Sequence, residues 1–114
     1  MILETQKVGR VVIANFLTED LDASNVSSFR SEISDVIKYE QSLVLNLSQL
    51  SFMDSSGLGA ILSTLRRIES RGGKMVVCNM GSTVKSLFEL VRMQKVIETF
   101  DSESSALAAF FDKE

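Results

Sequence analysis

The chain contains no histidine, no proline and no tryptophan, and it has a single cysteine among its 114 residues. Without histidine, a Ser-His-Asp or Cys-His catalytic arrangement cannot form within this chain, and neither can a metal site that includes histidine. One cysteine excludes an intrachain disulfide and a thiolate metal cluster. Only carboxylate sites for magnesium or calcium remain possible in principle. These absences count heavily against an enzyme.

Long hydrophobic runs and basic stretches are also missing. No apolar run approaches the roughly 18 residues of a membrane-spanning helix, and residues 1–7 lack the basic start and apolar core of a signal peptide. The net charge is −3 and the pI is about 5.0, with lysine and arginine scattered along the chain. A nucleic-acid-binding protein needs a basic stripe, which is not present. We therefore expect a cytoplasmic protein that binds neither nucleic acid nor membranes.

The length is typical of one domain. A chain of this size buries roughly two thirds of its unfolded surface, so it can form a core without disulfides or metal. Hydrophobic residues make up 45% of the sequence, and Cys78 lies in a strand-like run, where a small core residue is expected. No linker or low-complexity tract marks a boundary. We predict a single domain over residues 1–114.

Hydrophobic periodicity predicts strands that alternate with helices. The expected strands are 2–7, 10–17, 43–47, 75–78 and 95–100. The expected helices run from about 25 to 40, from Asp54 to about 71, from 81 through Val91, and from 101 through Phe111. Ser24 or Asn25 is expected to cap the first helix. Alternation implies parallel pairing through right-handed crossovers, with an antiparallel hairpin at the N-terminal edge. We predict an α/β domain with a mixed sheet of about five strands and about four helices.

The central stretch of the chain is 51–62, which follows the buried strand 43–47. Asp54 stands just before an amphipathic helix and is a candidate N-cap. Ser55 and Ser56 fall in or beside the first turn, at the positive end of the helix dipole. A phosphate on such a hydroxyl would be favoured by the dipole and the unpaired N–H groups, and opposed by the carboxylate of Asp54. A site balanced in this way suits a switch.

Gly57 and Gly59 fall in the same turn, although glycine costs about 1 kcal/mol in a helix interior relative to alanine. Their presence indicates close backbone approach, either to a neighbouring loop or to a partner. They form neither a dinucleotide fingerprint nor a P-loop, because the third glycine and the Lys-Ser/Thr pair are missing. A serine nucleophile lacks the Gly-x-Ser-x-Gly pattern and a histidine base. From the pattern alone, two interpretations of this turn are about equally supported: a capped helix start and a phosphorylation switch.

Acidic and apolar side chains provide two further candidates. Asp20 and Asp22 lie in the loop after the second strand, near the central stretch, and with Asp54 they would form an acidic rim. The alternative, an ordinary solvated loop with Asx caps, is favoured by the pattern alone. The candidates for exposed apolar surface are Met53, Leu58, Leu90, Met93, Phe110 and Phe111. Most are expected in the core, with Met53 and Met93 as the exceptions, because methionine adapts to partner surfaces.

The stretch from Leu43 to Leu62, with its Asp-Ser-Ser-Gly-Leu core, strongly resembles the signature of STAS domains. It is most similar to the small stand-alone bacterial anti-sigma factor antagonists. The resemblance extends over the whole chain, including the N-terminal hairpin, Leu21-Asp22 and residues 72–78 and 84–88. One departure is the loop of residues 18–22, which lacks a glycine common in the family. The resemblance implies a single STAS-type domain.

The resemblance also implies that Ser56 is a phosphoacceptor. The expected kinase is a partner anti-sigma factor with a histidine-kinase-like ATPase fold, and a metal-dependent serine phosphatase resets the site. The unphosphorylated form is expected to bind the anti-sigma factor and thereby free the sigma factor. The phosphorylated form is expected to release the anti-sigma factor. The residues expected to support the site or contact the partner are Asp22, Asp54, Ser55, Gly57 and Leu58. Phosphorylation adds about −1.5 to −2 charges, which would repel a complementary partner surface.

Two other hypotheses remain. The chain is alternatively a STAS scaffold subunit of a signalling, secretion or transport complex without a sigma factor output; the acceptor serine argues mildly against this. An enzyme that uses Ser55 or Ser56 is the third hypothesis, opposed by the missing histidine. No residue set demands a nucleotide or another cofactor. We expect a monomer when the chain is free, and the sequence does not name the kinase, the phosphatase or the pathway.

Overall fold

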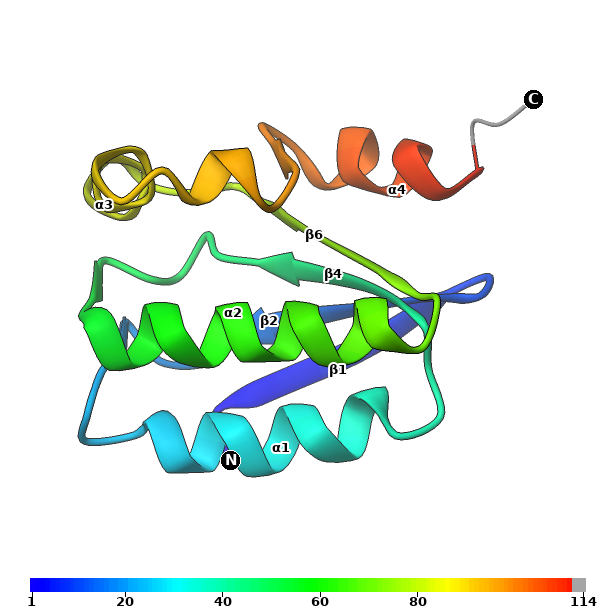
Figure 1. Ribbon diagram of the computed structural model, residues 1–114, viewed down its shortest axis with the longest axis horizontal. Helices are drawn as coiled ribbons and strands as arrows, with labels where there is room; N and C mark the ends of the chain where they lie inside the picture. The colour runs from blue at the N-terminus through cyan, green and yellow to red at the C-terminus, as the bar shows by residue number, and fades with distance from the viewer. Residues whose placement is uncertain (112–114) are drawn as a thin grey trace.

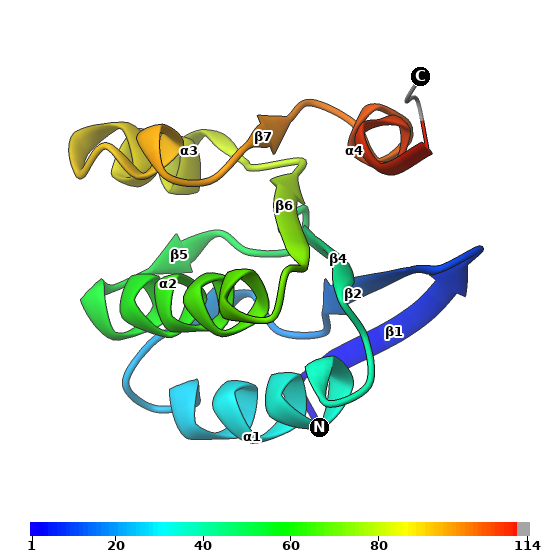
Figure 2. The same ribbon diagram turned by 45° about the vertical axis from the view of Figure 1, so that its right-hand side comes forward.

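A five-stranded mixed sheet forms the centre of the molecule, with helices on both faces (Figures 1 and 2). The computed structural model describes residues 1–111, and the last three residues of the predicted domain lie outside the described residues. In spatial order the strands are β1 (Leu3–Val8), β2 (Val11–Phe16), β4 (Ser42–Asn46), β6 (Lys74–Cys78) and β7 (Thr99–Phe100). The first pair is antiparallel and the other pairs are parallel. The predicted α/β fold is confirmed.

Residues 1–111 also form four helices and one short 3-10 turn. They are α1 (Val26–Ile37), α2 (Ser55–Ser70), α3 (Ser82–Leu90), η1 (Met93–Lys95) and α4 (Glu103–Phe111). After α2, Gly72 has a φ of +80°, which a side chain disfavours, so a glycine ends this helix close to the predicted residue 71. None of the helices within residues 1–111 combines the length and the apolar character needed to cross a membrane.

The sheet separates a large core from a small one. On the face covered by α1 and α2, Phe16 and Phe29 stack with ring centroids 5.4 Å apart among 24 buried residues. On the other face, α4 covers a smaller cluster that contains Ala106, Phe110 and Cys78. Burial, together with nearby Glu103, raises the pKa of the Cys78 thiol to about 11, which fits the predicted inert core residue.

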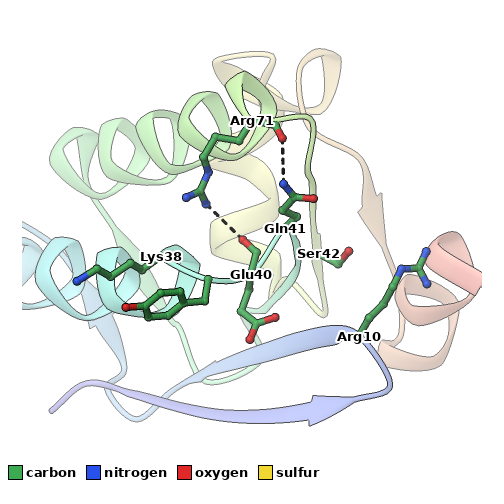
Figure 3. A pocket seen from close by; sticks show the side chains of 7 residues that line it. Arg10, Lys38, Glu40, Gln41, Ser42 and Arg71 are labelled. Atoms are coloured by element: carbon green, nitrogen blue, oxygen red, sulfur yellow. Dashed lines mark hydrogen bonds between the residues drawn. The ribbon is translucent and has the colours of Figure 1, made fainter.

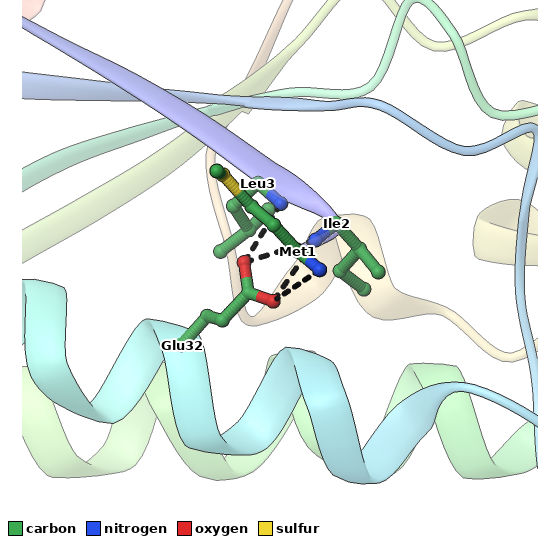
Figure 4. Close-up of polar contacts among 4 residues, drawn as sticks. All are labelled: Met1, Ile2, Leu3 and Glu32. Carbon is green, nitrogen blue, oxygen red and sulfur yellow. Dashed lines mark hydrogen bonds and ion pairs between the residues drawn. The ribbon is translucent and has the colours of Figure 1, made fainter.

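The N-terminal strand is tied to α1 by a carboxylate (Figure 4). Glu32 accepts hydrogen bonds from the backbone N–H groups of Ile2 and Leu3 at 2.9–3.0 Å, and the amino group of Met1 lies 3.7 Å from it. Among residues 1–111, β1 is an edge strand of the sheet with β2 as its neighbour. The side chain on α1 therefore fixes the position at which β1 begins.

Three local predictions are wrong: the side chain that caps α1, the residue at which α1 ends, and the length of the last strand. Asn25 occupies the N-cap position of α1 but does not cap it with its side chain; its amide instead accepts from the Asp22 N–H at 3.0 Å and donates to the Asp20 carbonyl at 2.9 Å. Ser24 is not the cap either, and α1 ends at residue 37 rather than 40. The predicted strand 95–100 is reduced to the two residues of β7, because η1 and the turn bonded to the Met93 carbonyl take its first half.

The predicted exposed methionines are also wrong. Met53 and Met93 are 4% and 6% exposed and belong to the large core. Leu90 and Phe111 are instead the exposed members of the candidate set, at 79% and 47%. Met53 is buried because its side chain faces the start of α2, a contact that depends on a pairing between loops far apart in the sequence.

Candidate functional site

A second, two-stranded sheet brings the predicted site residues together. β3 (Asp20–Leu21) pairs in parallel with β5 (Phe52–Met53), the segment directly before α2. The loop after β2 therefore lies beside the start of α2, at the carboxyl ends of the parallel strands, as expected from the sequence. Figure 2 shows β5 next to α2.

Asp54 caps α2 and also fastens the neighbouring loop. One carboxylate oxygen accepts from the N–H groups of Ser56 and Gly57, at 2.9 and 3.2 Å, and the other accepts from the Ala23 N–H at 3.1 Å. The predicted N-cap is confirmed. The Ser56 hydroxyl has the largest effect on the pKa of Asp54 and lowers it; burial opposes this, and the three N–H groups lower the pKa further. The carboxylate is therefore held in its charged form.

Ser56 is the serine whose hydroxyl is oriented by the protein. Its Oγ donates to Asp54 Oδ1 at 2.6 Å, a short charge-assisted bond, and the side chain remains partly exposed. Ser55 is exposed at the first position of the helix. A hydroxyl whose proton is directed at a carboxylate presents its lone pairs outward. The arrangement can offer Ser56 to an incoming electrophile, whereas Ser55 is only a solvated side chain.

Gly57 is required by a close contact with β3. A Cβ at this position would lie 2.6 Å from the carbonyl oxygen of Leu21 and 2.8 Å from the side chain of Met53, so any side chain would push the loop away. Gly59 differs: a Cβ there would meet nothing within 4 Å. The expected close approach to the loop therefore holds for Gly57 alone. Leu58 is partly buried and packs against the large core.

The predicted acidic residues belong to the segment next to this helix start. Asp22 lies in the loop that Asp54 fastens, and its carboxylate accepts from the N–H and the hydroxyl of Ser24 at 2.9 and 2.6 Å. This is the Asx-type local bonding that the alternative interpretation predicts. The acidic rim stays a prediction.

One hollow of the surface, with a volume of about 360 Å³, lies at the opposite end of α2 from this site. Figure 3 shows the side chains that line it. There Arg71 donates to the carbonyl oxygens of Ile37 and Glu40, and Gln41 donates to the carbonyl of Arg71 at 3.1 Å. The guanidinium satisfies carbonyl groups at the end of α1, a structural role. Among residues 1–111 no cluster of three or more cysteine, aspartate and glutamate side chains is placed to hold a metal ion.

Comparisons with known proteins show the family of the chain. Residues 3–106 match the model of the STAS domain family. The anti-sigma F factor antagonist of Paenibacillus polymyxa is 35% identical over 100 residues, which cover 86% of each chain.

Two solved structures of proteins named SpoIIAA are also similar, one of them described as a Bacillus cell fate determinant. The anti-sigma factor antagonist SpoIIAA in its unphosphorylated form has a TM-score of 0.73 at 26% identity, covering 98% of this chain and 99% of that one. The phosphorylated form of SpoIIAA has a TM-score of 0.72 at 27% identity, covering 95% and 98%. With the family match over nearly its whole length, the chain belongs to the STAS domain family.

Proposed function

We propose that this chain is an anti-sigma factor antagonist that is switched by phosphorylation of Ser56. The observation that carries the proposal is the 2.6 Å bond from the Ser56 hydroxyl to Asp54 at an accessible helix start. The names of its relatives support the role, and the existence of a phosphorylated form of one relative supports the chemistry. The partner is an anti-sigma factor with a histidine-kinase-like ATPase fold.

In the phosphorylation step, Ser56 Oγ attacks the γ-phosphorus of ATP held by the partner. An oxygen–phosphorus bond forms, the bond to ADP breaks, and the hydroxyl proton is lost. Asp54 orients the hydroxyl and is within reach of that proton. Because phosphoryl transfer depends mainly on positioning and charge stabilisation, orientation is the contribution this chain has to make.

The phosphate then acts through its charge. The helix start offers little compensation, because the N–H groups of Ser56 and Gly57 already donate to Asp54. An added charge of about −1.5 to −2 beside Asp54 and Asp22 is therefore largely unbalanced. It also removes the hydrogen bond that Ser56 donates. A partner surface that fits the unphosphorylated site is repelled, and a metal-dependent serine phosphatase restores binding.

Mass spectrometry after incubation with ATP and a lysate of the native host tests the acceptor. We expect one phosphate on Ser56, lost in Ser56→Ala and retained in Ser55→Ala, which is the matched control one position away. A phosphate on Ser55, or none while another kinase substrate in the same lysate is labelled, contradicts the proposal. If no phosphate is found, the alternative is favoured, a STAS scaffold that binds its partner constitutively.

A further inference from the structure

A groove between α1 and α2 carries two arginines from opposite sides. It has a volume of about 460 Å³, and the buried side chain of Ile33 forms part of its lining. Arg30 on α1 donates to the hydroxyl of Ser63 on α2 at 3.0 Å. Arg67 on α2 donates to the hydroxyl of Ser34 on α1 at 3.3 Å. Both guanidinium groups therefore extend across the groove.

These two charges have no counter-ion in the groove. Its lining contains serine, threonine and isoleucine beside the arginines, and no acidic residue. Within residues 1–111 neither Arg30 nor Arg67 lies within 4.0 Å of a carboxylate. Each guanidinium has five N–H donors, and one of them is used for the serine. In a chain of net charge −3, this is a concentrated site for an anionic group.

The spacing of the arginines indicates the form of that group. The contacts pair Arg30 with Ser63 and Ser34 with Arg67, so the two guanidinium groups lie on successive turns. Four residues of an α-helix span about 6 Å. Carboxylates at positions i and i+4 of a third helix have the same separation. A trough between two parallel helices is also the shape into which a helix packs.

Gly59 extends this face of α2 toward Ser56. It precedes Ser63 by four residues and follows Ser56 by three, so the three positions share one side of the helix. It is exposed, and the space above it is empty. A helix normally favours alanine over glycine at such a position. A missing side chain allows the backbone of a docked segment to come close to α2.

We infer that the α1–α2 groove docks an acidic helix of the anti-sigma partner, with carboxylates four residues apart on Arg30 and Arg67. The inference rests on the proposed function, because it assigns a second contact to the same partner. Ser56 is seven residues, about 10 Å, from the level of Ser63. This separation exceeds the Debye length at physiological salt, about 8 Å, so a phosphate on Ser56 and the docked helix are largely screened from one another. The groove is therefore a second contact that is separate from the switch.

The test is an NMR titration of the isotope-labelled chain with a synthetic alanine-based helix that carries glutamates four residues apart. We expect amide shifts along the facing sides of α1 and α2. The double variant R30Q/R67Q binds at least about tenfold more weakly, because two charge-assisted contacts are lost. Arg66→Gln is the matched control, since Arg66 is an exposed neighbour outside the groove lining. It retains wild-type affinity, and thermal melting confirms that each variant is folded.

Four results overturn the inference. The first is unchanged affinity of R30Q/R67Q for the peptide, and the second is an equal set of amide shifts with a peptide in which glutamine replaces glutamate. The third is a set of amide shifts centred on Arg10 and Lys38 and not on the groove. The fourth is the same set of shifts from inorganic phosphate at equal concentration. The titration uses no kinase and no ATP, so its failure leaves the phosphorylation of Ser56 to be decided by mass spectrometry. Conversely, if Ser56 is not phosphorylated but the peptide still binds, the phosphorylation switch is wrong and the docking groove stands.

Discussion

At the scale of single residues, the charge on Asp54 contributes to the stability of the fold. Its pKa is lower in the folded chain than its ordinary value of 3.8, chiefly because the Ser56 hydroxyl donates to it. A group with a depressed folded pKa stabilises the protein above its unfolded pKa, and this contribution is lost as the pH falls through the folded pKa. Protonation of Asp54 at acid pH is therefore expected to lower the free energy of unfolding.

The variant Asp54→Asn keeps a capping oxygen and removes the titration. We expect the denaturant midpoint of the wild type to fall as the pH drops below 3.8, and that of Asp54→Asn to fall less over the same range. Chemical denaturation at a series of pH values measures both slopes. Parallel curves would show that the bonds to Asp54 do not depend on its charge.

Gly57 and Gly59 allow the same substitution to be compared two residues apart. Gly57→Ala places a Cβ against the Leu21 carbonyl, and overpacking of this kind costs about 1–3 kcal/mol. Gly59→Ala meets open space and gains up to about 1 kcal/mol of helix propensity. Urea denaturation of both variants is expected to give changes of opposite sign. If the two variants changed the free energy of unfolding in the same direction, the difference in surroundings between Gly57 and Gly59 would be contradicted.

At the scale of elements, Glu32 holds β1 against α1 through three backbone hydrogen bonds. Glu32→Ala leaves these N–H groups without an acceptor, which costs about 1–3 kcal/mol. Asp35→Ala, an exposed change one turn further along α1, is the matched control and has little effect. Hydrogen exchange is expected to speed up at Ile2 and Leu3 in the first variant alone. Unchanged exchange there would show that the carboxylate does not fix the strand.

The elements with strong local signals were predictable from the sequence. α2 has an apolar face repeated over 16 residues and a capping aspartate, so its start and its cap followed from local chemistry. β3 and β5 have two residues each, too few to show periodicity, and only their pairing buries Met53. The Asn25 side chain was assigned to the wrong partner, because its bonds to the loop depend on tertiary structure. Sequence therefore predicted the start and the cap of α2, but not the contacts between this helix start and the neighbouring loop.

At the scale of the whole molecule, the proposed switch is expected to work without a change of fold. The unphosphorylated and phosphorylated forms of SpoIIAA resemble this chain to the same extent, with TM-scores of 0.73 and 0.72. The site lies at one end of the sheet, where Asp54 links two loops rather than two layers. A charge added at this end alters the surface that a partner meets, while the two cores stay in place. Partner release is therefore expected to follow from charge alone.

The most direct measurement uses immobilised chain loaded with its anti-sigma partner from the host lysate, then washed with ATP and magnesium. We predict that the wild type acquires phosphate on Ser56 and releases the partner. Ser56→Ala retains the partner, and Ser56→Asp does not bind it. Ser55→Ala behaves as the wild type. Release from Ser56→Ala by ATP, or full loading of Ser56→Asp, would contradict the central claim that a charge at Ser56 controls binding.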